Sequence, residues 1–394
     1  MITSSLIDAL KKKYPTIDKP FLKNLYFYHL GLGLVYYTYA TFNSSDSTGY
    51  YYEVSHNIRG ETWGSIYGTG TIFIEYFSYP FIRYLGLTYE GMMVLFAFFG
   101  FIGWIYLYIF FKEKLYFKHD FYGKDLIKVI FLLPNLHFWS SSLGKGALIF
   151  MAIGLFFYGI SSLKSRWIPV LISSVVIYHI RPHVMLVVLV STMLGFVFTT
   201  RGVSFFVKIL FLTIALTSFF YIYQNVLVAV GIKEEELLTE GLGLSHRAVE
   251  LTKATSGVDI ANYSLPFQIF TFLYRPLFVD APGMLGIIVS FENVFYLMMT
   301  IRLFNPRFIQ FIVTSNFLVK SCLMSFVMIS VALAQISGNL GLAIRQKSQV
   351  MMLFLFVVVC FLDNQKLRAY MDYNFRLSRQ NKPPQPVPEV KPAQ

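Results

Sequence analysis

The chain has 394 residues, of which 56% are hydrophobic and 14% charged, and its mean hydropathy is +0.57. A soluble domain carries about 25% charged residues, so this composition excludes a soluble enzyme, a disordered chain and a secreted disulfide scaffold. A formal net charge of +12 would suggest nucleic acid as the partner of a soluble protein. Here membrane topology accounts for the excess, and no nucleic-acid partner is expected.

Apolar runs of about 20 residues recur along the chain. Because backbone groups in lipid must be hydrogen-bonded internally, these runs predict an all-α fold, a polytopic transmembrane helical bundle of about ten spans. The expected spans are residues 22–42, 88–111, 126–142, 145–161, 167–180, 184–200, 204–230, 283–300, 308–335 and 349–363.

The distribution of basic residues predicts the orientation and the domain organisation. With the N-terminus inside, 22 of the 33 Lys and Arg residues fall on the cytoplasmic side, as the positive-inside rule requires. Both termini are then cytoplasmic. Residues 1–21 form a cytoplasmic N-terminal segment, residues 22–363 a single transmembrane domain, and residues 364–394 a Pro-rich, disordered cytoplasmic tail.

Two extracytoplasmic segments, 43–87 and 231–282, are longer than connecting loops. The first contains the apolar stretch TIFIEYFSYPFIRYLGL and the second contains FQIFTFLYRPLFVDAPG. Charged residues and prolines interrupt both stretches, which argues against full crossings. We expect outer-face segments that are re-entrant or interfacial, with a cavity on that side.

Basic residues are retained in short outer connections, where positive charge normally opposes insertion. Guanidinium groups match phosphate oxygens, and the natural anion at this depth is a lipid phosphate or diphosphate. For any single residue, the alternative is an interfacial anchor. The candidate substrate-binding residues are Lys145, Arg181, Arg275, Arg345 and Lys347.

Asp46, just after the first span, is a candidate general base that would take a proton from an acceptor hydroxyl. The alternative is a turn or helix cap in SSDST. Glu53 and Glu61 are rivals on the same segment, and His183 in HIRPH is a second catalytic candidate.

Glu292 and Lys320 are the ionisable residues deepest in the expected spans. Since an unpaired charge in lipid is costly, we expect them to pair with each other, with a proton or ion pathway as the functional alternative. Cys322 and Cys360 are interpreted as small packing residues. The chain has no GxxxxGK[ST], HExxH or CxxC motif, so no metal or cofactor is expected and ATP-driven transport by this chain alone is excluded.

Taken in order, several short motifs resemble a known family. They are Asp46 after the first span, LPNLHFWSSSLGKGAL, IRPH, FLYRPLF with SFENVFYL, and GNLGLAIRQKSQ. This order is similar to that of bacterial Wzy-type and EpsG-like polysaccharide repeat-unit polymerases and, more distantly, of GT-C membrane glycosyltransferases.

The resemblance implies a bundle in the bacterial inner membrane, with an outward-facing cavity and polyprenyl-diphosphate-linked oligosaccharide as donor. It assigns Arg181, His183, Arg275 and Arg345 to the diphosphate and Asp46 to activation of the acceptor. Membrane lipid and other polysaccharide-assembly proteins are the implied partners. Asp46 lacks the second acid of a metal-binding Asp-x-Asp, so the resemblance does not extend to a metal-dependent mechanism.

Two other classes of function fit the same sequence. Pro134, Pro182 and Pro276 break expected helices, as in a transporter or flippase for a lipid-linked or anionic solute. A non-catalytic membrane scaffold would use its aromatic surfaces to bind partner helices. A scaffold would tolerate loss of charge at the outer residues, whereas an enzyme would not.

Overall fold

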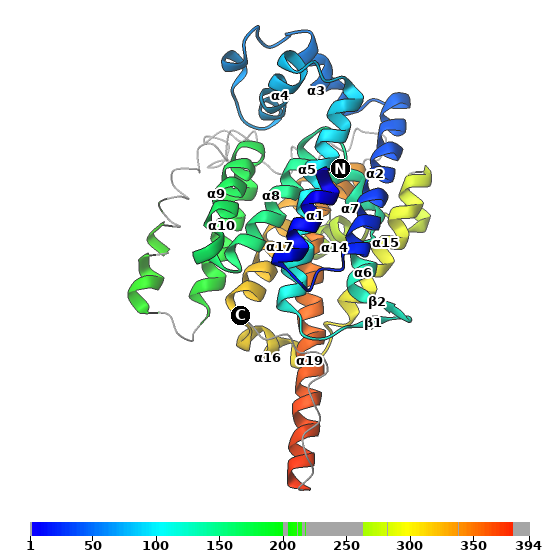
Figure 1. The fold of residues 1–394 in the computed structure, drawn as a ribbon. Helices are drawn as coiled ribbons and strands as arrows, with labels where there is room; N and C mark the ends of the chain where they lie inside the picture. The colour runs from blue at the N-terminus through cyan, green and yellow to red at the C-terminus, as the bar shows by residue number, and fades with distance from the viewer. Residues whose placement is uncertain are drawn as a thin grey trace.

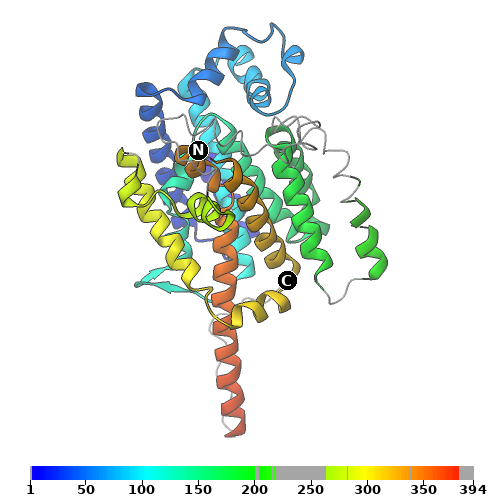
Figure 2. The same cartoon turned by 180° about the vertical axis from the view of Figure 1, so that it is seen from behind.

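The protein is a helical bundle with a small helical cap at one end, as the computed structural model shows (Figure 1). The structure describes residues 2–199, 204–210, 212–214, 217, 263–281, 283–337 and 339–380. Helix α19 (Met351–Arg379) begins in the middle of the bundle and projects far beyond it at the end opposite the cap (Figures 1 and 2).

The elements of the first half lead from the side of the bundle to the cap and back. α1 packs on the bundle through Ile7 and Leu10, and α3 to η2 form the cap. In order, the elements are α1 (Ile2–Lys13), α2 (Lys19–Phe42), α3 (Asp46–Ser55), η1 (Trp63–Ile66), α4 (Thr71–Tyr79), the π-helical η2 (Pro80–Tyr84), α5 (Tyr89–Lys114), β1 (Asp120–Phe121), β2 (Lys124–Asp125), α6 (Leu126–Ile130), α7 (Pro134–Ser140), α8 (Lys145–Ile160), α9 (Leu163–Ile180) and α10 (Pro182–Val197). The two strands pair antiparallel.

The second half supplies the face seen in Figure 2. Its described elements are α14 (Leu265–Tyr274), η3 (Phe278–Asp280), α15 (Gly283–Ile301), α16 (Arg307–Thr314), α17 (Phe317–Ile336), α18 (Leu340–Lys347) and α19. Residues 351–361 of α19 are all buried, because the helix is surrounded by the rest of the bundle.

Several helices are long and apolar enough to cross a membrane, which is consistent with a multi-pass membrane protein. By length and composition, the described residues contain three such helices, Tyr89–Lys114, Gly283–Ile301 and Phe317–Gln335. The number rises to five if each of two bent pairs is one span: α7 with α8, bent by 110°, and α18 with α19, bent by 53°. The expected number of about ten is not reached by this measure.

Two expected spans are wrong as continuous helices. Residues 126–142 form α6 and α7, and residues 308–335 are divided between α16 and α17. Pro134 explains the first break, since proline has no N–H to donate and is accommodated at the first turn of a new helix. Asn316 explains the second, because its side chain accepts a hydrogen bond from the Val319 amide and so begins α17.

The outer segments and the tail are described in part. In the first outer segment the apolar stretch forms α4 and η2, which are too short to cross, and α14 covers part of the second. Residues 364–379, expected to be disordered, continue α19 as a helix. Residues 381–394, most of the expected span 204–230 and residues 231–262 lie outside the described residues.

Close approach of backbones at glycine fixes α5 against its neighbours. A Cβ placed on Gly100 would lie 1.7 Å from the carbonyl oxygen of Ser140 in α7, and one on Gly103 would lie 2.8 Å from the Cα of Met151 in α8. Small residues permit such contacts between helices, and their packing contributes to bundle stability in lipid.

Substitution of Gly100 by alanine tests this contact. We expect Gly100→Ala to destabilise the protein by about 1–3 kcal/mol, because backbone atoms must move to relieve the overlap. Thermal unfolding in detergent measures the effect, with Gly31→Ala as the matched control, since a Cβ on Gly31 meets no atom within 4 Å. Equal melting temperatures for the two variants would contradict the close packing of α5 on α7.

Candidate functional site

The break between α7 and α8 positions the candidate site. Gly144 separates the two helices with φ +153°, a conformation that side chains rarely allow, and its position for a Cβ is 3.3 Å from the ring of Tyr50. The chain therefore turns by 110° within a few residues. The turn leaves Trp139 near the end of α7 and Lys145 at the start of α8, where Lys145 contacts Thr71 of the cap.

Three cationic residues, Lys145, Arg181 and Arg345, form what we call the cation cluster. Lys145 interacts electrostatically with both arginines, and its Nζ donates a hydrogen bond to Oγ1 of Thr71 in the cap at 2.7 Å. Arg181 lies between α9 and α10 and is 8% exposed, while Arg345 comes from α18. Three segments distant in sequence thus bring like charges together, an arrangement suited to an anion.

Asp46 joins this cluster through an ion pair. Its Oδ2 accepts a hydrogen bond from Nη1 of Arg345 at 2.5 Å, although 299 residues separate the two. Ser45 rather than Asp46 is the N-cap of α3, accepting from the Ser47 amide, so the cap is not the role of Asp46. The Asp46 side chain is about half exposed, which leaves oxygen atoms accessible.

Burial and nearby charges shift the pKa values of two cap residues next to this cluster, Tyr50 and Glu75. Burial, together with the nearby negative charge of Asp46, raises the pKa of Tyr50 to about 12, so its hydroxyl is protonated at neutral pH. Burial also raises the pKa of Glu75, while its ion pair with Arg59 opposes the rise. Lys145 interacts electrostatically with Glu75 as well as with Asp46.

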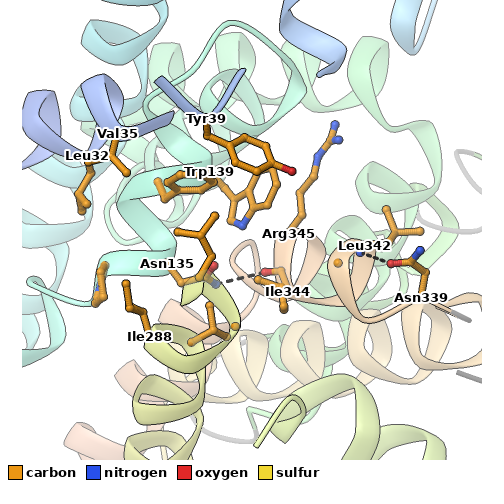
Figure 3. Close-up of a pocket in the computed structure, with 16 residues that line it drawn as sticks. Leu32, Val35, Tyr39, Asn135, Trp139, Ile288, Asn339, Leu342, Ile344 and Arg345 are labelled. Carbon is orange, nitrogen blue, oxygen red and sulfur yellow. Dashed lines mark hydrogen bonds between the residues drawn. The ribbon is translucent and has the colours of Figure 1, made fainter. Parts of the chain in front are cut away.

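An apolar cavity of about 510 Å³ opens beside Arg345 (Figure 3). Its size is that of a small-molecule site, and most of its wall is hydrophobic or aromatic. The guanidinium of Arg345 lies 5.8 Å from the ring centroid of Trp139, so one cation borders both the cavity and the cluster. Its lining comes from α2 (Leu32, Val35, Tyr39), α7 (Pro134, Asn135, Phe138, Trp139), α15 (Leu285, Gly286, Ile288, Val289) and the segment of α18 (Asn339, Gly341, Leu342, Ile344, Arg345).

Lys347 does not serve the anion site expected for it. Its side chain is 0% exposed, and Nζ donates to Oδ1 of Asn293 at 2.7 Å and to the carbonyl oxygen of Arg275 at 2.9 Å. A buried ammonium must satisfy its donors inside the protein, so this charge stabilises the junction of α14, α15 and α18. The assignment of Lys347 to the diphosphate is therefore wrong.

The structure gives less support to a site role for Arg275 and His183 than for the residues of the cation cluster. Arg275 ends α14 and forms a local ion pair with Asp280, so its charge is largely compensated there. His183 follows Arg181 in the first turn of α10 and is half-buried. Among the described residues, no group of three or more His, Cys, Asp or Glu side chains has the arrangement to hold a metal ion.

Glu292 and Lys320 do not pair with each other, contrary to expectation. Glu292 accepts hydrogen bonds from the Asn135 amide at 2.9 Å and from the hydroxyl of Tyr296, so it caps the start of α7. Lys320 donates to the carbonyl oxygen of Phe198 at 2.9 Å, at the end of α10. Negative charge at the start of a helix and positive charge at its end both interact favourably with the helix dipole. Glu292 therefore stabilises α7, and Lys320 stabilises α10.

Sequence reasoning missed the walls of the cavity. Neither Tyr39 nor Trp139 was expected as a site residue, whereas both line the cavity. Asn135 was not singled out, although its side chain donates to the carbonyl oxygen of Ile344 at 3.2 Å and ties α7 to α18. The motif LPNLHFW contained the signal, because polar residues beside a mid-span proline indicate a broken helix.

A pair of substitutions at Glu292 tests its capping role. Glu292→Leu leaves the amide of Asn135 without its acceptor, and we expect a loss of about 1–3 kcal/mol in the free energy of unfolding. Glu292→Gln retains an accepting oxygen and should lose less. Thermal unfolding in detergent compares them, and equal losses for both variants would point instead to a requirement for the charge itself.

No family model, curated protein or solved structure matches the chain. The resemblance to polysaccharide polymerases therefore remains one of short motifs and of their order. The functional conclusion that follows depends on the ion pair of Asp46 and Arg345, on the cation cluster and on the adjoining cavity.

Proposed function

We propose that the protein is a membrane glycosyltransferase of the polysaccharide-polymerase type, acting on polyprenyl-diphosphate-linked sugars at the extracytoplasmic face. The observation that carries the proposal is the ion pair of Asp46 with Arg345 beside Lys145, at the edge of an apolar cavity. A carboxylate, an anion site and an apolar wall are the three parts that transfer from a lipid-linked sugar requires.

The cavity and the cation cluster suit the two ends of such a donor. An isoprenoid chain is apolar and would occupy the cavity between α2, α7 and α15. The diphosphate carries several negative charges and would face Arg345, Lys145 and Arg181. Because Arg345 borders the cavity and also contacts Asp46, the sugar–phosphate bond would lie close to the carboxylate.

The reaction follows from these positions. A hydroxyl oxygen of the acceptor attacks the anomeric carbon of the donor sugar, the bond from that carbon to the phosphate oxygen breaks, and the lipid diphosphate leaves with the electron pair. The hydroxyl proton passes to the carboxylate of Asp46, the general base. The cation cluster stabilises the negative charge that develops on the leaving diphosphate.

The same proposal gives the cellular setting. The protein lies in the bacterial inner membrane with both termini in the cytoplasm and the cap in the periplasm. Other polysaccharide-assembly proteins supply the lipid-linked unit and receive the product. The distribution of charge supports this orientation. The last turn of α5, at the end of the bundle opposite the cap, carries Lys112 and Lys114, and positive charge at helix ends favours the cytoplasmic side.

A transporter or flippase for a lipid-linked or anionic solute is the second candidate. Two helix breaks favour it: α7 bends by 110° into α8, and α18 bends by 53° into α19. Transporters use broken helices to form substrate sites within the membrane. Movement of the lipid without formation of a glycosidic bond distinguishes this function from transfer.

Glycan analysis in cells that express this chain tests the proposal. We expect Asp46→Asn and Arg345→Gln, at wild-type expression, to lower the yield of long chains by roughly 10²–10³-fold, because each removes an interaction that stabilises the transition state. Single lipid-linked units should accumulate on the outer face.

Arg83→Gln is the matched control, since Arg83 is an exposed arginine of the cap whose side chain donates a hydrogen bond to the carbonyl oxygen of Ser55. Unchanged chain length in both Asp46→Asn and Arg345→Gln would contradict the proposal and favour a scaffold. Accumulation of units on the cytoplasmic face would favour the flippase.

A further inference from the structure

Two histidines meet ring to ring inside the bundle, and the proposed function does not use either of them. His29 comes from α2 and His137 from α7, and both are 0% exposed. Their Nδ1 atoms lie 2.9 Å apart, which is a hydrogen-bond distance between two nitrogens. One proton must lie between them for this contact to be attractive.

The other two ring nitrogens already require a proton each. Nε2 of His29 lies 3.0 Å from the carbonyl oxygen of Ala97, and Nε2 of His137 lies 2.8 Å from that of Phe131. A carbonyl oxygen only accepts hydrogen bonds, so both Nε2 atoms must donate. The four nitrogens therefore call for three protons, whereas two neutral imidazoles carry two.

We propose that His29 and His137 form a buried proton-binding site that holds this third proton between the two Nδ1 atoms. The pair then carries one positive charge spread over two rings. The indole ring of Trp104 stacks on His137 with centroids 3.8 Å apart and planes 8° apart, and an aromatic face stabilises a cation. Burial disfavours the charge, and the three hydrogen bonds and this stack oppose that cost.

Among the residues that the structure describes, no carboxylate contacts either histidine ring directly. From α2, the ring of Tyr28 lies 5.1 Å from His137, and its hydroxyl donates to the carbonyl oxygen of Leu132. From α15, Glu292 acts on Tyr28 electrostatically. From α5, the facing side chains are Phe101 and Trp104, and Trp104 donates to Oγ of Ser140.

The proton site links the two helices that form much of the cavity wall. α2 contributes Tyr39 to the cavity and α7 contributes Trp139. Loss of the shared proton leaves two lone pairs facing each other at 2.9 Å, which is repulsive. Deprotonation should therefore weaken the contact between α2 and α7 and alter the cavity, whatever ligand the cavity takes.

The pH dependence of stability gives the first test, and its sign is fixed by proton counting. A histidine in an unfolded chain has a pKa of about 6.5. Above that value, the folded pair holds one proton more than the unfolded chain, so stability falls as pH rises through the titration of the pair. For two neutral rings the stability would instead be flat above about pH 6.5.

The variant His29→Asn isolates this contribution. The amide of asparagine donates to Nδ1 of a neutral His137, so the contact survives without a third proton. We expect the equilibrium constant for folding of wild type, relative to this variant, to fall by up to tenfold per pH unit within the titration. His56→Asn, at an exposed histidine, is the control and should follow wild type.

A spectroscopic measurement keeps the proposal testable if the variant fails to fold. In the full-length wild type labelled with ¹⁵N-histidine, we expect at pH 7 two protonated Nε2 atoms and a through-hydrogen-bond coupling between the two Nδ1 atoms. An unprotonated Nε2 in either ring would overturn the proposal. A stability difference between wild type and His29→Asn that is flat above about pH 6.5 would also overturn it.

Discussion

The site depends on the seven-residue helix α7, whose start is fixed by a hydrogen bond and whose end is followed by a sharp turn at a glycine. At its start, the Asn135 amide of α7 donates a hydrogen bond to Glu292 of α15, 157 residues further along the chain. At its end, the backbone conformation of Gly144 turns the chain into α8. Between these points α7 presents His137 to α2 and Trp139 to the cavity. A continuous helix through this region would not present these side chains in the same way.

The cost of burying charge divides the cationic residues into two groups. Lys320 and Lys347 lie in the bundle and donate to backbone carbonyls or to an amide, so their charges stabilise helix ends and junctions. Lys145 and Arg345 lie at the cap end, where their partners are a hydroxyl and a half-exposed carboxylate. Arg345 and Lys347 come from the same short helix, yet they belong to different groups.

Much of the architecture could be predicted from the sequence, because hydropathy and proline positions report on it directly. The all-α class, the failure of the apolar stretch in the first outer segment to form a full crossing, and the grouping of Asp46 with Arg345 on one side follow from such patterns. The contact between these two residues could not be predicted, since it joins positions 299 residues apart and depends on helix packing.

The errors have equally local causes. Lys347 lies two residues after Arg345, and residues two apart on a helix point in widely different directions, so a shared motif did not imply a shared site. Pro134 was among the prolines expected to break helices, yet residues 126–142 were assigned to a single span because their average hydropathy is high. Glu292 and Lys320 each bond to a backbone group, and Glu292 also accepts from the hydroxyl of Tyr296; sequence reasoning about pairs of charged side chains does not consider such partners.

Direct binding of a lipid diphosphate is the measurement that tests the central claim, that the cation cluster and the cavity together form one site for an anionic lipid. Affinities of purified wild type in lipid nanodiscs would be compared for a polyprenyl diphosphate and for the polyprenol of equal length. The account predicts at least about tenfold tighter binding of the diphosphate, corresponding to about 1.4 kcal/mol, and loss of this preference in Arg345→Gln. Equal affinity of wild type for the two lipids would contradict it.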